Sequence, residues 1–311
     1  MKKAFYRILL TAAILPTVGS GCVNEEREHH NPVVQLAFEP VMHAQVRAGE
    51  TPDNTGDTGN NSFGVSAWTL DQTENWSSGS ENAELFLDRE KLLRDGVFWY
   101  PESKPDWPSY QYNLACIGFA PFDAVTQCDN SQGVVFDDVD TSTDPGDLRY
   151  TLPQANLSKK QNGGVVTLPM IPALCEVSFR VRGVSEYETA RIFVRSISLE
   201  NVKLKGSFHS LPNPSWELKD ATGAINFFEG DWPVGYSPQV IGETRRIIPQ
   251  DLDASLRIAY DVVAPSQDRI PEEVFGLEIK RSLSAGHQYA FTLAISASGV
   301  EVIQENPSQI D

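Results

Sequence analysis

The sequence is poor in basic residues, and this scarcity limits the partners that the protein can bind. Its 311 residues include 25 Lys and Arg against 42 Asp and Glu, which gives a formal net charge of −17. Nucleic acids and anionic lipid surfaces are bound through clusters of Lys and Arg, so we expect neither as a partner. The chain is nevertheless that of a folded protein, because 41% of its residues are apolar and can form a core.

Long apolar runs and the common catalytic motifs are also missing. The run at residues 8–18 is shorter than the roughly 20 residues that a transmembrane helix needs. The sequence contains no CxxC pair, no HExxH motif, no GxSxG elbow and no phosphate-binding loop. We therefore expect no enzyme, no metal ion and no cofactor. A hydrolase whose two carboxylates meet only in the folded chain remains an alternative.

The N-terminus has the form of an export signal. Basic residues precede the apolar run 8–18, and small residues then lead to Cys22. This order is typical of a bacterial lipoprotein signal, in which the cysteine becomes the lipidated first residue of the mature chain. We expect residues 1–21 to be removed and Cys22 to carry the lipid. An ordinary signal peptide followed by a chance cysteine is the alternative.

Three cysteines remain after the lipidated one: Cys116, Cys128 and Cys175. Export permits a disulfide between Cys116 and Cys128, although burial of unpaired thiols is the favoured alternative. The acidic segment 137–147 departs from the EF-hand pattern, so we favour a solvated turn there over a calcium site.

Alternation of apolar and polar residues dominates the second half of the chain. The clearest runs are 175–181, 256–262, 275–279 and 289–295. A period of two predicts strands with one buried and one solvent-facing side. In the first half, 63–70 and 114–119 also predict strands, whereas 84–94 fits either a strand or a helical face. We therefore expect an all-β fold of antiparallel β-sandwiches.

The polar segment that ends in Asn-Gly-Gly at 162–164 is the expected domain boundary. A separate alternating strand, which contains Val34, Leu36 and Phe38, precedes a long polar loop. The expected division is a signal peptide, a tether with a removable strand, an N-terminal sandwich and a C-terminal sandwich, at residues 1–21, 22–47, 48–163 and 164–311.

The order of several short motifs resembles the fimbrillins of Bacteroidia, the Mfa-like lipoprotein subunits of type V pili. After the signal ending at Cys22 come Phe-Gly-Val-Ser-Ala-Trp at 63–68, Val-Phe-Trp-Tyr-Pro at 97–101, the strand 114–121, Ile-Pro-Gln at 248–250 and Leu-Ser-Ala-Gly-His-Gln-Tyr at 283–289. The resemblance extends over nearly the whole chain.

The resemblance implies two transthyretin-like sandwiches and a mechanism without catalysis. In that family the first strand fills a groove until an Arg-specific protease cuts the loop after it, and a neighbour's C-terminal segment then takes its place. For this sequence the resemblance implies lipidation at Cys22, cleavage between Arg47 and Ala48, a temporary strand at Val34, Leu36 and Phe38, and a donor strand at Val300, Val302 and Ile303.

The implied function is that of a stalk or tip subunit of an adhesive fimbria. The implied partners are other fimbrial subunits, in a homo- or hetero-polymer, the protease, and the outer membrane through the lipid before processing. Export would pass through the periplasm to the cell surface, and the receptor is unknown. The alternatives are an uncleaved pilus anchor and a surface lipoprotein that binds glycans through Trp99, Tyr100 and Trp107, unless these aromatics fill the core.

Overall fold

The computed structural model describes residues 34–42, 62–79, 81–184, 190–265 and 268–310. Cys22, Arg47 and Ala48 lie outside these ranges. Strands dominate the described chain, beside one short helix, α1 (Lys159–Asn162), and one 3-10 turn, η1 (Phe122–Ala124). The prediction of an all-β sandwich fold is confirmed. No helix in these ranges is long and apolar enough to span a bilayer.

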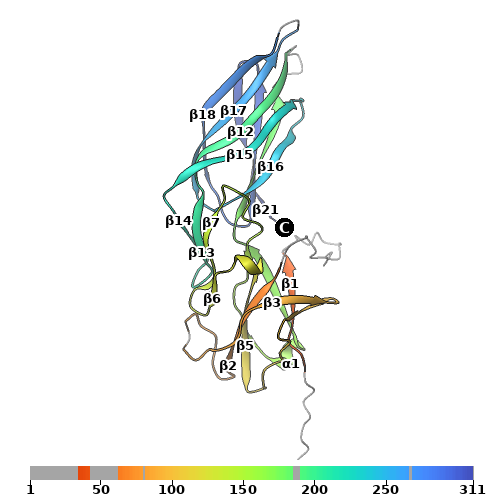
Figure 1. Ribbon diagram of the computed structural model, residues 1–311, viewed down its shortest axis with the longest axis vertical. Coiled ribbons are helices and arrows are strands. Elements are labelled where there is room, and N and C mark those ends of the chain that lie inside the picture. Colours follow the sequence, from red (N-terminus) through yellow and green to blue (C-terminus); the bar gives the residue numbers. More distant parts are fainter. Residues whose placement is uncertain (1–33, 43–61, 80, 185–189, 266–267, 311) are drawn as a thin grey trace, which may run out of the picture. The chain divides into compact units, whose positions relative to one another are not determined.

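The first part of the chain forms a sheet of eight strands, of which β1, β2, β3 and β5 are labelled in Figure 1. Their order is β2 (Gly64–Asp71), β3 (Glu84–Asp95), β4 (Phe98–Pro101), β1 (Ala37–Met42), β10 (Val165–Pro172), β8 (Arg149–Tyr150), β5 (Tyr112–Ala120) and β9 (Gln154–Leu157). Because β2 also pairs with β5, all of these strands except β9 belong to a closed ring. Apolar side chains from its strands form one core, which we call the ring core.

A second, smaller sheet packs on the other side of β2 and β5. Its strands are β14 (Ser215–Leu218), β13 (Lys205–His209), β7 (Gly133–Asp140) and β6 (Gln127–Asp129). Trp68 of β2 and Phe119 of β5 join Phe136 and Phe208 of this sheet in a separate core. Strands β2 and β5 are therefore buried on both faces, which explains their nearly continuous apolar sequences.

The remaining strands form a two-sheet sandwich around the largest core of the chain. One sheet contains β16 (Gln239–Ile247), β11 (Cys175–Gly183), β19 (His287–Ser296), β20 (Gly299–Gln304) and β21 (Ser308–Gln309). The other contains β15 (Thr222–Pro233), β12 (Arg191–Lys203), β17 (Asp251–Val263) and β18 (Ile270–Ser282), which lie side by side in Figure 1. The apolar members of the runs predicted at 175–181, 256–262 and 289–295 are buried in this core, as expected. The opposite faces are not all solvent-facing, since Ser178, Asp261, Thr292 and Ala294 are buried as well.

The sheets do not change at the expected boundary after residue 163. Strand β10 begins at Val165 and pairs with β1 and β8 in the ring, so the Asn-Gly-Gly segment ends α1 instead of a domain. Strands β13 and β14 come later in the sequence, yet β13 pairs with β7. The ambiguous segment 84–94 forms strand β3. Two pairings, β1 with β10 and β11 with β19, are parallel, whereas an antiparallel arrangement was expected.

Gly242 allows β16 to pass close to β15. Its φ is +70°, and a Cβ atom there would lie 2.0 Å from the carbonyl oxygen of Phe227. We expect Gly242→Ala to lower the free energy of unfolding by roughly 3 kcal/mol, measured by urea denaturation. Gly146 also has a positive φ, +83°, but a Cβ there would meet nothing within 4 Å. Gly146→Ala should therefore cost only about 1 kcal/mol, and equal losses would contradict the crowding at Gly242.

Candidate functional site

Strand β1 is inserted in the ring between β10 and β4 (Figure 1). All six of its residues pair in parallel with Val165–Met170 of β10, and Phe38 pairs with Trp99 of β4. Parallel neighbours require a long crossover connection. Here that connection is everything from the end of β1 to the start of β10, so β1 is separated in sequence from the strands that hold it.

The extended segment ahead of β1 is paired as well. The Leu36 amide donates to the Pro105 carbonyl at 3.0 Å, and the Trp107 amide donates to the Val34 carbonyl at 2.8 Å. The Ala37 amide donates to the carbonyl of Gly164 at 2.9 Å. Backbone groups on both edges of the segment 34–42 are therefore engaged, as they are in an interior strand of a sheet.

Gly164 is the residue that lets this segment approach β10. Its φ is +94°, and a Cβ atom there would lie 2.3 Å from Cγ1 of Val34. A side chain at position 164 would thus be strained by the positive φ and would force the side chain of Val34 to move. The Gly-Gly sequence that suggested a domain boundary therefore lies directly against the segment that leads into β1.

The side chains of β1 and of the residues directly ahead of it complete the ring core. Leu36 and Phe38 are both 0% exposed, and Ala37 between them is 3% exposed. Val34 is half-buried, and Met42 packs against the same core. Their core neighbours include Phe63, Leu92, Trp107, Val166, Leu168 and Met170. Removal of β1 would leave an apolar groove beside a free edge of β10, which we call the β1 groove.

The predicted donor residues lie on an edge strand of the C-terminal sandwich. In the described chain β20 pairs only with β19. Val300 and Val302 are partly buried against the C-terminal core, and Ile303 is half-buried. These side chains are held less deeply than Leu36 and Phe38 are held in the ring.

Glu305 fastens the chain just beyond β20. Its carboxylate accepts hydrogen bonds from Arg180 at 2.8 Å and from the hydroxyl of Thr292 at 2.7 Å, and its amide donates to Ala290 at 3.2 Å. Charge-assisted hydrogen bonds of this kind are stronger than neutral ones. The C-terminal segment is therefore docked on its own sandwich by polar as well as apolar contacts.

The aromatic residues proposed for sugar binding are used in packing. Trp107 is 5% exposed and belongs to the ring core. Trp99 packs edge-on against Phe63, with ring centroids 4.9 Å apart, and Tyr100 is half-buried. A stacking surface of Trp99, Tyr100 and Trp107 is not formed, so the glycan-binding alternative loses the residues that motivated it.

Carboxylates of the acidic segment 137–147 are engaged by neighbouring donors. Their partners are Ser207 for Asp137, Lys219 for Asp138, Lys205 for Asp140, Arg246 for Asp144 and Arg149 for Asp147. Hydrogen bonds from Ser142 and Lys205 lower the pKa of Asp140 to about 2. Within the described ranges, no three His, Cys, Asp or Glu side chains converge to hold a metal ion. Hydrogen bonds and ion pairs to neighbouring strands and loops thus hold the segment 137–147 in place.

The three cysteines in the described part of the chain are packed in its interior. Cys116, Cys128 and Cys175 are buried and free, so the disulfide considered between the first two is not formed. Burial raises the pKa of Cys128 and of Cys175 to about 12 each. Because the thiolate is the reactive form, neither thiol is suited to nucleophilic chemistry at neutral pH.

Comparison with known proteins identifies the fold. No protein-family model matches the sequence, and no curated protein matches it. A fimbrial protein from Bacteroides vulgatus has a similar structure, with a TM-score of 0.70 at 16% identity over 89% of this chain and 99% of that one.

Two candidate cell adhesion proteins are also similar in structure. The one from Bacteroides uniformis has a TM-score of 0.54 at 14% identity, over 89% of this chain and 98% of that one. The one from Bacteroides ovatus has a TM-score of 0.55 at 8% identity, over 90% of this chain and 98% of that one. At these identities the likeness shows a shared fold, and at that level the resemblance to fimbrial proteins of Bacteroidia is confirmed.

Proposed function

We propose that this chain is a structural subunit, of the stalk or the tip, of a type V fimbria that contributes to adhesion at the cell surface. In this proposal the chain is exported as a lipoprotein with the lipid on Cys22 and is held in the outer membrane. An Arg-specific protease cuts between Arg47 and Ala48, and a donor strand from a neighbouring subunit replaces β1. The donor offered by this chain is the segment around Val300, Val302 and Ile303.

The position of β1 is the observation that carries the proposal. All six of its residues pair with β10 and its Phe38 is buried, as is Leu36 in the hydrogen-bonded segment directly ahead of it. Its only covalent link to the rest of the fold runs through residues 43–61, which contain Arg47. A cut in that link would leave β1 held by non-covalent contacts alone. Another extended strand could then use the same backbone edge and the same groove, which is the physics of β-strand addition.

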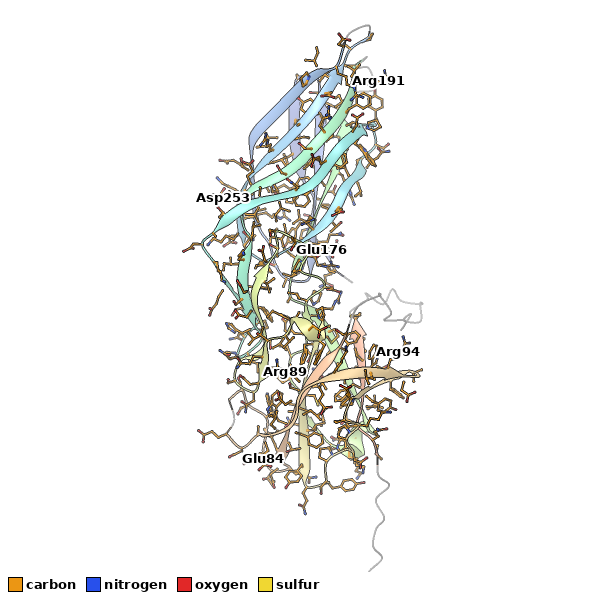
Figure 2. The ribbon with its side chains drawn as sticks, in the orientation of Figure 1. Glu84, Arg89, Arg94, Glu176, Arg191 and Asp253 are labelled. Atoms are coloured by element: carbon orange, nitrogen blue, oxygen red, sulfur yellow. The ribbon has the colours of Figure 1, made fainter. Side chains whose placement is uncertain are left out.

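The placement of arginine in the chain supports selective cleavage. Every described arginine except Arg269 lies in a β-strand. Figure 2 shows three of them, Arg89 and Arg94 on β3 and Arg191 at the start of β12. Proteases cut preferentially at exposed loops, where the backbone is free to enter the protease active site. The arginines of the strands are poor targets for this reason.

Arg269 lies directly ahead of β18 and is anchored there by its side chain. It bonds to Asp231 at 2.8 Å and to Asp261 at 3.3 Å, and it lies over the ring of Phe193 at 4.2 Å. Outside the described ranges the mature chain would contain only Arg27 and Arg47, and only Arg47 follows β1. We therefore expect Arg47 to be the cut that makes β1 removable.

Limited digestion of the purified mature chain tests the proposal. An Arg-specific protease should give one dominant internal product that begins at Ala48, identified by mass spectrometry, and Arg47→Gln should abolish it. A labelled synthetic peptide of residues 34–42 should then enter the cut protein by exchange with the resident β1, but should not enter the Arg47→Gln variant. A Lys-specific protease is the matched control, because Lys104 and Lys219 lie between strands. Preferential cutting elsewhere, or no uptake of the peptide after cutting at Arg47, would refute the proposal.

A further inference from the structure

The β1 groove is specific about the strand that it can hold. Leu36 and Phe38 point into the ring core, and both are 0% exposed. Ala37 points to the other side of the sheet and is 3% exposed, so that side is also covered at this position. A strand that replaces β1 must therefore carry a large apolar residue, a small residue and a second large apolar residue in succession.

The C-terminal strand of this chain does not meet that requirement. Its only two apolar residues at a spacing of two are Val300 and Val302, and the residue between them is Glu301. Placed in the groove, this strand would bring Glu301 to the covered position of Ala37. Glu301 stays in the middle whether the strand enters parallel or antiparallel to β10. In its own sheet Glu301 is exposed to solvent, and burial of an unpaired carboxylate is strongly unfavourable.

The two valines also underfill the groove. They would replace Leu36 and Phe38, and the volume lost at the phenylalanine site would remain as a cavity in the ring core. In the register parallel to β10, Gln304 would occupy the place of Pro40, and Asn306 that of Met42, which packs against the ring core. In either direction of entry, Val300 and Val302 are the only pair of β20 residues that puts apolar side chains at both the Leu36 and the Phe38 positions.

We infer that the β1 groove takes its donor strand from a different subunit and not from a second copy of this chain. The partner segment has a large aliphatic residue, then Ala, Gly or Ser, then an aromatic residue. The inference rests on the proposed function, since it assumes that β1 is exchanged. It places this chain next to an unlike subunit in the fimbria, and the cut protein alone stays monomeric.

Peptide binding to the cut mature protein, freed of its β1 segment, tests the inference. The first probe is the peptide of residues 34–42, and the second is the peptide of residues 298–310. The third is the second peptide with V300L, E301A and V302F. The fourth carries V300A, E301L and V302F, which has the same composition as the third but puts the small residue in the wrong place. Fluorescence anisotropy with labelled peptides gives the dissociation constants.

We expect the first and third peptides to bind at least tenfold more tightly than the second and the fourth. A tenfold change in the dissociation constant corresponds to only about 1.4 kcal/mol, and burial of the unpaired Glu301 carboxylate alone is strongly unfavourable. Sedimentation should show the cut protein to be monomeric by itself. Binding of the second peptide as tight as that of the first, or self-assembly of the cut protein, would overturn the inference while leaving the proposed function intact. If neither the first nor the third peptide binds, the groove is no docking site, and the proposed function fails together with the inference.

Discussion

Phe38→Ala in the uncut chain is expected to lower the free energy of unfolding by about 3–5 kcal/mol. Phe38 is 0% exposed in the ring core, and its ring fills a space that Ala would leave empty. Close-packed interiors relax only partly around such a loss, so the cost exceeds the transfer free energy of the removed atoms. Urea denaturation followed by tryptophan fluorescence measures the change.

The adjacent residue on the same strand provides the matched control. Glu39 is half-buried and is absent from the ring core. Glu39→Ala should therefore change the free energy of unfolding by less than about 1 kcal/mol. Similar losses for the two variants would show that β1 contributes to stability only through its backbone, and that the groove has no pocket for the side chain of Phe38.

Complete removal of β1 should cost more than any single substitution in it. Cutting at Arg47 and separating the freed segment would expose the surfaces buried by Leu36 and Phe38 at once and would break the six-residue ladder with β10. Burial of two large apolar side chains and several net hydrogen bonds together correspond to roughly 5 kcal/mol or more. The C-terminal core contains no residue of β1. Calorimetry should therefore show two unfolding transitions in place of one. The transition of the ring should move to a lower temperature, and that of the C-terminal sandwich should stay where it was.

Refilling the groove should reverse this loss. Addition of the peptide of residues 34–42 should raise the temperature of the first transition in a concentration-dependent way, because a ligand that binds only the folded state stabilises it. The Arg47→Gln variant, carried through the same digestion and separation, should show the single transition of the uncut protein. An unchanged transition temperature after loss of β1 would mean that the ring does not depend on that strand.

The sequence was sufficient to predict most individual strands but not the sheets to which they belong. Strands β11, β17 and β19 alternate regularly because each buries one face in a single core. Strand β3 could not be assigned, because it pairs with β2 through Lys91 and with β4 from Leu92 onward. The buried Leu87 and Leu92 are therefore five positions apart, which breaks the period of two.

The sequence indicates which side chains of residues 34–42 are buried, but not what surrounds them. Alternation identifies Leu36 and Phe38, and both are buried, Phe38 in strand β1 and Leu36 in the hydrogen-bonded segment ahead of it. The residues that receive them were not identified, because Pro105, Trp107 and Gly164 are in loops whose sequences show no periodic pattern. The Asn-Gly-Gly segment predicts a turn, and a turn can lie between two domains or within one. Turn residues alone therefore do not distinguish a domain boundary from a change of direction inside a domain.

Hydrogen exchange in β10 tests most directly the central claim that β1 is a replaceable strand. The backbone amides of residues 165–170 that face β1 (Pro169 has no amide hydrogen) should be protected in the uncut chain and should exchange faster once the protein has been cut at Arg47 and freed of β1. They should become protected again when a strand of the large–small–large type occupies the groove. The amides of β17 in the C-terminal sandwich are the internal reference and should not change. Protection of residues 165–170 that is unaffected by the loss of β1 would contradict the account.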